Sequence, residues 1–197
     1  MFFPKPVTMP RFITLLACIG FPCCMYAQPN APLLSEGAKV IFKNIKTKTT
    51  DAEKNFIYQK LQVKLAKDKK SFVLEGQPVE VRVFPTDLNK DGIEEVFATL
   101  TSGALFGNTG QTVLLFMKDK AGKYQQQTEI VGGIPIILSS RNLEYMDIVI
   151  AGPGLEHPAF RWNGKDYRYF KTVKDESLAK NSYDLTSFSK QYTDNLK

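Results

Sequence analysis

Two kinds of hydrophobic periodicity divide this chain. Between residues 52 and 65, apolar side chains recur near helical spacing, which predicts a helix with one apolar face. Thr50 followed by Glu53 matches a capping box, so we expect that helix to begin there and to run through about Lys67. Beyond it, apolar and polar residues alternate, as they do along half-buried strands. The pattern predicts an α+β fold, mainly β, with one N-terminal helix followed by antiparallel β-hairpins.

The alternating part breaks into short strands separated by turn residues. Asn163 and Gly164, between the last two strands, are typical of a type I′ turn. Such regular spacing favours an antiparallel meander or a partial propeller-like sheet. The predicted strands cover residues 71–74, 79–84, 95–100, 112–118, 123–128, 135–138, 146–151, 159–162 and 166–170.

The ends of the chain differ from this middle part. A run rich in Pro and Asn opens a loose arm, and a weakly alternating stretch at residues 37–45 predicts a short strand within it. A short helix is expected near residues 185–192. The resulting organisation is a signal peptide (1–27), an arm with a short strand (28–49), a single β-rich domain with its helix (50–173) and a polar C-terminal segment (174–197).

The first residues indicate export. Lys5 and Arg11 precede an apolar run that ends at Ala27, a small residue after which a signal peptidase could cut. A transmembrane helix needs about 18 to 20 continuous apolar residues, and this run falls short. We therefore expect a periplasmic or extracellular protein without a membrane span. The alternative is a lipoprotein anchored at Cys18, because residues 15–18 resemble a bacterial lipobox.

Composition limits the chemistry of the exported chain. All three cysteines lie in the signal segment and the chain has one histidine, which excludes disulfides, thiolate zinc sites and imidazole clusters after cleavage. Removing Lys5 and Arg11 lowers the formal charge from +6 to +4. The remaining lysine-rich stretches, 39–48 and 64–70, indicate solvated faces rather than a nucleic-acid surface. The expected partner is a protein or a glycan.

The most specific signal is the acidic run DLNKDGIEEV, residues 87–96. Oxygen-bearing groups at alternate positions can turn inward onto one hard cation, and Gly92 at the sixth position allows the sharp bend that this requires. Three neighbouring carboxylates would repel one another without a cation. We predict a structural Ca²⁺ site whose ligands are Asp87, Asn89, Asp91, the backbone carbonyl of Ile93, and Glu95.

This run resembles the Asp-x-Asn-x-Asp-Gly-x-x-Glu/Asp loops of FG-GAP and VCBS-type β-repeats. The resemblance is close over residues 84–99 and implies a calcium site at a hairpin tip in a small exported bacterial domain. This chain has one acidic loop where those proteins have several. An EF-hand is disfavoured, because Ala98 stands at position 12 and the flanking segments are strand-like. A metal-free acidic turn is the other interpretation of the same residues.

An internal repeat is a further hypothesis. Residues 95–99 can be aligned with residues 147–151, and each segment is followed by a glycine-bearing loop, an aromatic strand and a Gly-Lys turn. The aligned copies span 95–124 and 147–167. In this alignment the second copy lacks an acidic loop.

Other candidate residues favour binding over catalysis. Glu156 beside His157 could act as the general acid and base of a hydrolase, but no nucleophile motif accompanies them, so we expect no enzyme. Two loops, 101–111 and 152–158, could instead block the active site of an envelope enzyme, which would make the protein an inhibitor or accessory protein. The last hairpin offers a possible ligand surface of Arg161, Trp162, Tyr167 and Tyr169, although cross-strand pairing explains these side chains equally well.

Overall fold

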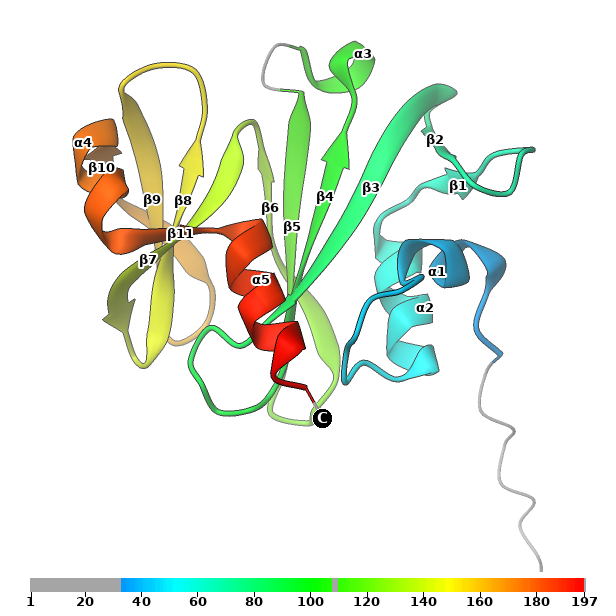
Figure 1. Cartoon of the computed structure of the whole chain (residues 1–197), viewed down its shortest axis with the longest axis horizontal. Coiled ribbons are helices and arrows are strands. Elements are labelled where there is room, and N and C mark those ends of the chain that lie inside the picture. Colours follow the sequence, from blue (N-terminus) through cyan, green and yellow to red (C-terminus); the bar gives the residue numbers. More distant parts are fainter. Residues whose placement is uncertain (1–32, 108–109, 197) are drawn as a thin grey trace, which may run out of the picture. The chain divides into compact units, whose positions relative to one another are not determined.

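The computed structural model describes residues 33–107 and 110–196 (Figure 1). The chain divides into two units, residues 1–30 and 31–197, and the following description concerns the second. Within the described ranges, eleven strands form two sheets and five helices accompany them. All the strand pairs are antiparallel. The prediction of a mainly β, α+β fold built from antiparallel hairpins is confirmed.

The predicted export signal at residues 1–27 and the alternative lipidation site at Cys18 lie outside the described residues. Within the described part of the chain, none of the helices has the length and apolar character needed to cross a bilayer.

The first sheet has the strand order β1-β2-β3-β4-β5-β6. This order follows the sequence, so each strand pairs with the one before it through a hairpin turn. The strands are β1 (Lys64–Leu65), β2 (Phe72–Leu74), β3 (Gln77–Thr86), β4 (Glu95–Thr101), β5 (Gln111–Lys118) and β6 (Tyr124–Val131).

The second sheet has the order β10-β9-β8-β7-β11. Four of its strands are again sequential, and the C-terminal β11 adds to the free edge of β7. The strands are β7 (Ile134–Asn142), β8 (Tyr145–Ala151), β9 (Glu156–Trp162), β10 (Tyr167–Lys174) and β11 (Ser182–Asp184). Every strand predicted between residues 71 and 170 is present, as β2 to β10.

The predicted strand at residues 37–45 is wrong, because its core is the helix α1 (Glu36–Ile41). Ser35 caps this helix by accepting the amide of Ala38. Ala38, Ile41 and Phe42 are all buried, and their i, i+3, i+4 spacing is helical rather than alternating.

The helix α2 (Asp51–Lys60) has the predicted capping box of Thr50 and Glu53, but it ends before Lys67. Gln62 has a left-handed backbone conformation (φ 57°) just beyond the helix. Leu65 then belongs to β1 and packs against the same core as α2. Of the apolar stripe predicted over residues 52–65, Ile57 and Leu61 are buried and Leu65 is half-buried, but Ala52 is exposed. The spacing therefore predicted the apolar face only in part, and the chain reaches Leu65 as a strand.

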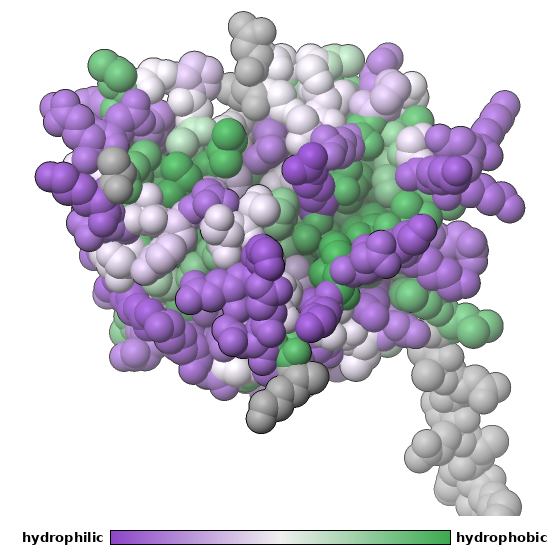
Figure 2. Space-filling model, in the orientation of Figure 1, coloured by the Kyte–Doolittle hydropathy of each residue, from purple (hydrophilic) through white to green (hydrophobic). Residues whose placement is uncertain are grey.

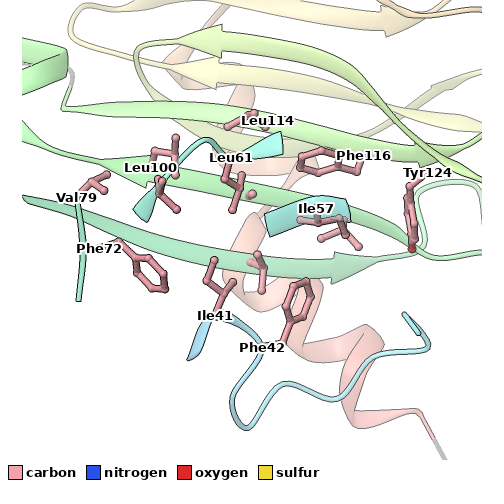
Figure 3. Packing of buried hydrophobic residues seen from close by; sticks show 14 residues of the cluster. Ile41, Phe42, Ile57, Leu61, Phe72, Val79, Leu100, Leu114, Phe116 and Tyr124 are labelled. Atoms are coloured by element: carbon pink, nitrogen blue, oxygen red, sulfur yellow. The ribbon is translucent and has the colours of Figure 1, made fainter. Parts of the chain in front are cut away.

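One hydrophobic core fills the space between these helices and the first sheet (Figure 3). Ile57 and Leu61 from α2 and its C-terminal cap meet side chains from β3, β4 and β5. Leu100, Leu114 and Phe116 supply much of the sheet side of this core. Covering this face of the sheet with α1 and α2 removes its apolar side chains from water.

A second core lies between the two sheets. Phe97 of β4 and Leu115 of β5 pack against Ile148 of β8, and Leu185 and Phe188 from the helix α5 (Leu185–Asp194) close one side. This helix confirms the prediction near residues 185–192. A third, smaller core lies on the other face of the second sheet, beneath the helix α4 (Asp175–Asn181).

The two sheets contain equivalent meanders, β3 to β6 and β7 to β10. Val96 pairs with Phe116 in the first, and Ile148 pairs with Phe160 in the second, which is the register of the predicted repeat. Tyr124 donates its hydroxyl to the carbonyl of Glu94 at 2.8 Å, and Tyr167 donates to the carbonyl of Met146, also at 2.8 Å. Each tyrosine thus binds the residue just before the aligned segment begins, so the two copies are structurally equivalent.

The equivalent meanders stack with corresponding faces pointing the same way. Ile148 lies in the core between the sheets, whereas its counterpart Val96 lies beneath α2. Phe97 lies on the face of the first sheet opposite to that of Val96. This face packs against the face of the second sheet that carries Ile148. This is a head-to-tail arrangement, with helices covering the two outer faces.

On the face shown in Figure 2, an apolar region is visible over β3, between α1 and α5. A short helix, α3 (Gly103–Phe106), stands in the glycine-rich loop between β4 and β5. The equivalent loop between β8 and β9 exposes Leu155. The acidic loop precedes β4, whereas these two loops follow β4 and its equivalent strand β8. The acidic loop therefore lies at the opposite end of the strands from both of them.

Candidate functional site

The acidic loop connects β3 to β4 and is folded by its own polar groups. Asp87 Oδ2 accepts the amide of Gly92 at 3.0 Å, which closes the loop from its first position to its sixth. Asp91 Oδ1 accepts the amide of Ile93 at 2.7 Å. Gly92 has φ 81°, a left-handed conformation that glycine adopts without strain. The loop is therefore the sharp hairpin tip expected from its sequence.

Glu95 begins β4 and points into the molecule. Its side chain is 2% exposed, and Oε2 accepts the amide of Leu88 at 2.7 Å. The pKa of Glu95 is raised to about 8, chiefly by burial and also by the neighbouring charges of Asp87 and Asp91, and the hydrogen bond from the Leu88 amide opposes this rise. A carboxylate placed in this way is costly to ionise unless a positive charge approaches it.

Negative charge around Glu95 also affects the facing sheet. Tyr145 of β8 has its pKa raised to about 12, first by burial and then by the charges of Glu95, Asp91 and Asp87. None of the ion pairs among the described residues includes any of these three carboxylates. Asp87 Oδ1 is buried and has no hydrogen-bond partner. The loop thus combines excess negative charge with an unpartnered acceptor.

Asn89, the third predicted ligand position, is half-buried and donates its amide to Asp91 Oδ2 at 2.7 Å. Ile93, whose carbonyl was the fourth ligand, exposes its side chain. Over residues 33–107 and 110–196, no three Asp, Glu, His or Cys side chains are grouped as a metal cluster. The structure brings the five predicted residues into one loop, and the loop is held by hydrogen bonds.

The equivalent position in the second meander has its own cation. Asp147 corresponds to Glu95 and is completely buried. Its Oδ1 accepts Arg161 Nε at 2.9 Å and its Oδ2 accepts Arg161 Nη2 at 2.7 Å, a two-pronged ion pair. Continuing each strand register by one position makes Met117 the counterpart of Arg161, and Met117 carries no charge.

A residue not predicted from the sequence, Glu94, anchors the segment before α2. Its side chain is 2% exposed. Oε1 accepts the hydroxyl of Thr47 and, at 2.5 Å, the hydroxyl of Thr49, while Oε2 accepts the amide of Lys48 at 3.0 Å. These contacts join parts of the chain more than 40 residues apart, so no local pattern could have indicated them.

Lys48 provides a second connection to the acidic loop. Its ammonium donates to the carbonyl of Gly92 at 2.8 Å and lies 6.0 Å from the centre of the Tyr192 ring in α5. Lys48 therefore joins the acidic loop to the N-terminal segment and also lies near the C-terminal helix. Anything that orders the loop also orders these connections.

The structure separates Glu156 from His157. The imidazole of His157 is buried and its Nε2 lies 2.6 Å from Asp175 Oδ1, at the start of α4. Glu156 is exposed and pairs across the strands with Lys174. Successive residues of a strand point to opposite faces, which explains why the two side chains do not meet.

The possible ligand surface is also divided between the two faces of its sheet. Trp162 contacts the ring of Tyr167 at 5.5 Å, on the face that packs against the first sheet. Arg161 points to the other face, pairs with Asp147 and lies 4.0 Å from the centre of the Phe170 ring. Only Tyr169 is well exposed, and its hydroxyl lies 3.0 Å from Thr172 Oγ1. The four residues do not form one stacking platform, because strand alternation separates them.

Comparisons with known proteins return no match, whether with protein-family models, curated proteins or solved structures. The functional argument for this chain therefore depends on its own geometry.

Proposed function

We propose that this protein is an exported binding module whose fold is stabilised by Ca²⁺ at the loop between β3 and β4. The ion would be held by oxygens of Asp87, Asn89, Asp91, Ile93 and Glu95. Its role is structural: it fastens the hairpin tip to which the segment before α2 and the helix α5 are attached.

One observation carries this proposal, the difference between two equivalent carboxylates. Asp147 is buried and paired with Arg161, while Glu95 is buried and takes part in no ion pair among the described residues. A buried carboxylate without a counter-charge is unfavourable. A cation bound in the acidic loop would compensate the negative charge of Glu95, as the guanidinium of Arg161 compensates that of Asp147.

The residues present suit calcium in their chemistry. Ca²⁺ prefers six to eight oxygen ligands from carboxylates, amide carbonyls and water. Asp87 Oδ1 is buried and unpartnered, so it can accept an ion without losing a hydrogen bond. When bound, the ion supplies positive charge to three carboxylates that share one loop. The loop resembles the calcium loops of FG-GAP and VCBS-type repeats in these same residues.

A binding role is favoured over catalysis by the surroundings of the single histidine. His157 is 3% exposed and bonded to Asp175 on the side that faces α4. A general base must reach the proton that it removes. The surface that remains accessible, including the loops around α3 and Leu155, is suited to contact with a protein or a glycan.

The test is thermal unfolding of the chain from residue 28 onward, with calcium or with chelator. For a dissociation constant of about 0.1 mM, calcium at 1 mM stabilises the folded state by about 1.4 kcal/mol. In a domain of this size that raises the midpoint by about 3–6 °C. Isothermal titration calorimetry under the same conditions should give one site per chain.

Asp87→Ala combined with Asp91→Ala should abolish the calcium response. The matched control is Asp119→Ala, which removes an acidic side chain that accepts amides in another hairpin turn. That variant should lose some stability and keep the full calcium shift. An unchanged midpoint of the unsubstituted protein across millimolar calcium would refute the proposal.

A further inference from the structure

The outer edge of β3 is open over residues 80–84. β2 pairs with Gln77 to Val79 only, while β4 pairs with residues 80–86 along the opposite edge of β3. Pro85 closes the far end, because it has no amide and its carbonyl accepts the hydroxyl of Ser189 of α5 at 2.7 Å. Among the described residues, no backbone hydrogen bond outside the strand pairs involves residues 80–84. Alternate residues there direct an amide and a carbonyl away from β4, so this short edge is able to accept a further strand.

β6 and β10, the other long strands with a free edge in the described ranges, are less regular. The pairing of β6 with β5 shifts between Leu115 and Phe116, and the pairing of β10 with β9 shifts between Tyr169 and Lys171. Such bulges twist an edge strand and hinder the addition of another strand. The register of β3 with β4 runs without a shift. The β3 edge is therefore the one best suited to pairing.

Clefts border this edge on both faces of the sheet. A cleft of about 560 Å³ is lined by Val81 of β3 together with Val40 and Ile41 of α1. Phe84, whose side chain points to the opposite face, lines a cleft of about 400 Å³ beside the start of α5. Figure 2 shows apolar side chains over β3, between these two helices. The side chains of an added strand would enter the two clefts in alternation.

An extended polypeptide is the occupant that matches this edge. Its backbone offers acceptors and donors at the spacing of a strand, and addition to a sheet edge is a common mode of peptide recognition. The side chains of Glu80 and Arg82 are 57% and 63% exposed, and their only ion pair among the described residues is with each other. A segment antiparallel to β3, as β2 and β4 are, is complementary when an acidic residue lies opposite Arg82 and a basic residue lies opposite Glu80.

A second copy of the chain matches the same edge less well. A two-fold dimer must pair the two edges antiparallel, and the register that uses residues 80–84 of both copies is centred on Arg82. That register places the two Arg82 side chains opposite each other, which is destabilising for like charges. A separate peptide has no such constraint, so the charge pattern favours another protein as the partner.

We infer that the β3 edge binds an extended segment of another protein, which adds to the first sheet as an antiparallel strand. β-Branched residues of the segment lie opposite Val81 and Val83, a glutamate lies opposite Arg82 and a lysine lies opposite Glu80. This inference names the partner class of the proposed binding module and rests on that binding role. It does not depend on the calcium site.

The probe is the peptide acetyl-Thr-Val-Glu-Val-Lys-amide, whose residues would lie opposite residues 84 to 80 in that order. The control is acetyl-Thr-Val-Lys-Val-Glu-amide, which has the same composition and net charge but sets like charges opposite each other. Isothermal titration calorimetry uses the chain from residue 28 onward, in 1 mM calcium. We expect the probe to bind about tenfold more tightly than the control, because both cross-strand ion pairs are reversed in the control.

Exchanging the two charges of the edge should exchange the preference. In the double variant Glu80→Arg with Arg82→Glu, the internal ion pair is kept, so the unfolding midpoint should be unchanged. This variant should bind the control peptide about tenfold more tightly than the probe. Arg168→Gln, which breaks a pair with Asp166 in the second sheet, should keep the original preference.

Hydrogen exchange locates the peptide on the protein. Saturating probe should slow exchange in a fragment covering residues 79–86 and leave fragments of β6 and β10 unchanged. Equal affinity for the two peptides, an unreversed preference in the double variant, protection of β6 or β10 instead of β3, or no binding at 1 mM peptide would each overturn the inference. So would a dimer that protects residues 80–84 without peptide, since a second copy would then be the occupant.

The calcium melting experiment contains no peptide, so the two proposals fail separately. A protein that responds to calcium and binds neither peptide disproves this inference and leaves the calcium proposal standing. A protein that binds the probe without a calcium response refutes only the calcium site.

Discussion

At the scale of single residues, the molecule handles two buried carboxylates in two ways. Asp147 shares its charge with Arg161, whose side chain is 34% exposed, and it also accepts the hydroxyl of Ser140 at 2.5 Å. The carboxylate of Glu95 accepts a hydrogen bond from the amide of Leu88 and has no ion pair among the described residues. The free-energy cost of burying a carboxylate depends on whether a cation is paired with it. Removing the cation should therefore lower the stability of the protein by the cost that the cation had offset.

Arg161→Met should destabilise the protein by about 2–3 kcal/mol in urea unfolding, because Asp147 stays buried without its cation. This value lies just below the range of about 3–5 kcal/mol for fully buried pairs, since Arg161 is partly solvated. Replacing both partners, Asp147→Leu with Arg161→Met, should recover most of the loss.

The control for that prediction is Arg168→Met, which breaks an exposed pair with Asp166. Its effect should stay within about 0.5 kcal/mol. If Arg161→Met behaved like this control, the ion pair would not be compensating for the burial of Asp147.

A second residue-scale prediction concerns Glu95 in the metal-free protein. Its pKa is about 8 when folded and about 4.5 when unfolded. Between these values the unfolded chain releases a proton that the folded chain retains, so stability is present at low pH and is lost as the pH rises toward 8. In chelator, unfolding free energy measured in urea should fall from pH 5.5 to 7.5, by at most about 1.4 kcal/mol per pH unit for one proton.

The titratable groups that interact electrostatically with Glu95 are Asp87 and Asp91 in the loop and four tyrosines, Tyr124, Tyr145, Tyr167 and Tyr192. Glu95→Gln removes the titrating group and keeps its shape, so its stability should be flat over the same range. A slope shared by both proteins would assign the pH dependence to other residues.

The sequence predicted that the acidic run lies at a hairpin tip, and the run does connect β3 to β4, but the contacts around this loop were not predicted. Asp87 and Gly92 are five residues apart, so their contact is local and readable from spacing. Glu94 contacts a segment more than 40 residues away, and the partner of Asp147 is set by strand register. Such contacts depend on the tertiary fold, which no local pattern encodes.

At the scale of elements, the segment between α1 and α2 is held to the sheet by one buried carboxylate. Glu94 accepts from the hydroxyls of Thr47 and Thr49 and from the amide of Lys48. The same segment leads directly into the capping box of α2, where Thr50 is the cap. The position of the N-terminal helices therefore depends on this contact.

Glu94→Ala should loosen that segment locally. Leaving three donors without their acceptor costs about 2 kcal/mol or more. Hydrogen exchange of a peptide covering residues 44–50 should accelerate about 30-fold, since each 1.4 kcal/mol is tenfold. A peptide from β5 should exchange at its normal rate.

Glu129→Ala is the matched control, because Glu129 is exposed on β6 and bonded only to the side chain of Gln126 at 3.2 Å. It should leave exchange in residues 44–50 unchanged. Normal protection of that segment in Glu94→Ala would show that the helices are held by their hydrophobic core alone.

The elements themselves were predicted unevenly. Nine strands were predicted between residues 71 and 170, and all nine are present. The central strands β4, β5 and β8 are buried on both faces rather than on one. The stretch at 37–45 was ambiguous over a short length, and the cap at Ser35 decides for a helix. The strand β11 was missed, since its three residues pair with β7 through contacts that the fold provides.

At the scale of the whole described unit, two meanders stack in the same direction. The face of the first that carries Phe97 meets the face of the second that carries Ile148, and these are opposite faces of equivalent strands. Repeats stacked in this way leave two unlike ends. Helices α1 and α2 cover one end and α4 covers the other, which explains how two repeats suffice without further copies.

This equivalence predicts matched energetics for Tyr124 and Tyr167. Both are buried, and both donate at 2.8 Å to the carbonyl of the residue that precedes the aligned segment. Replacing either with Phe leaves one buried carbonyl without its donor and should cost about 1–1.5 kcal/mol in urea unfolding. The two costs should agree within about 0.5 kcal/mol, while Tyr169→Phe, at the exposed end of the set, should change little. A large loss of unfolding free energy in one variant and none in the other would contradict the prediction. It would show that the two hydrogen bonds contribute unequally to stability although their strand registers are equivalent.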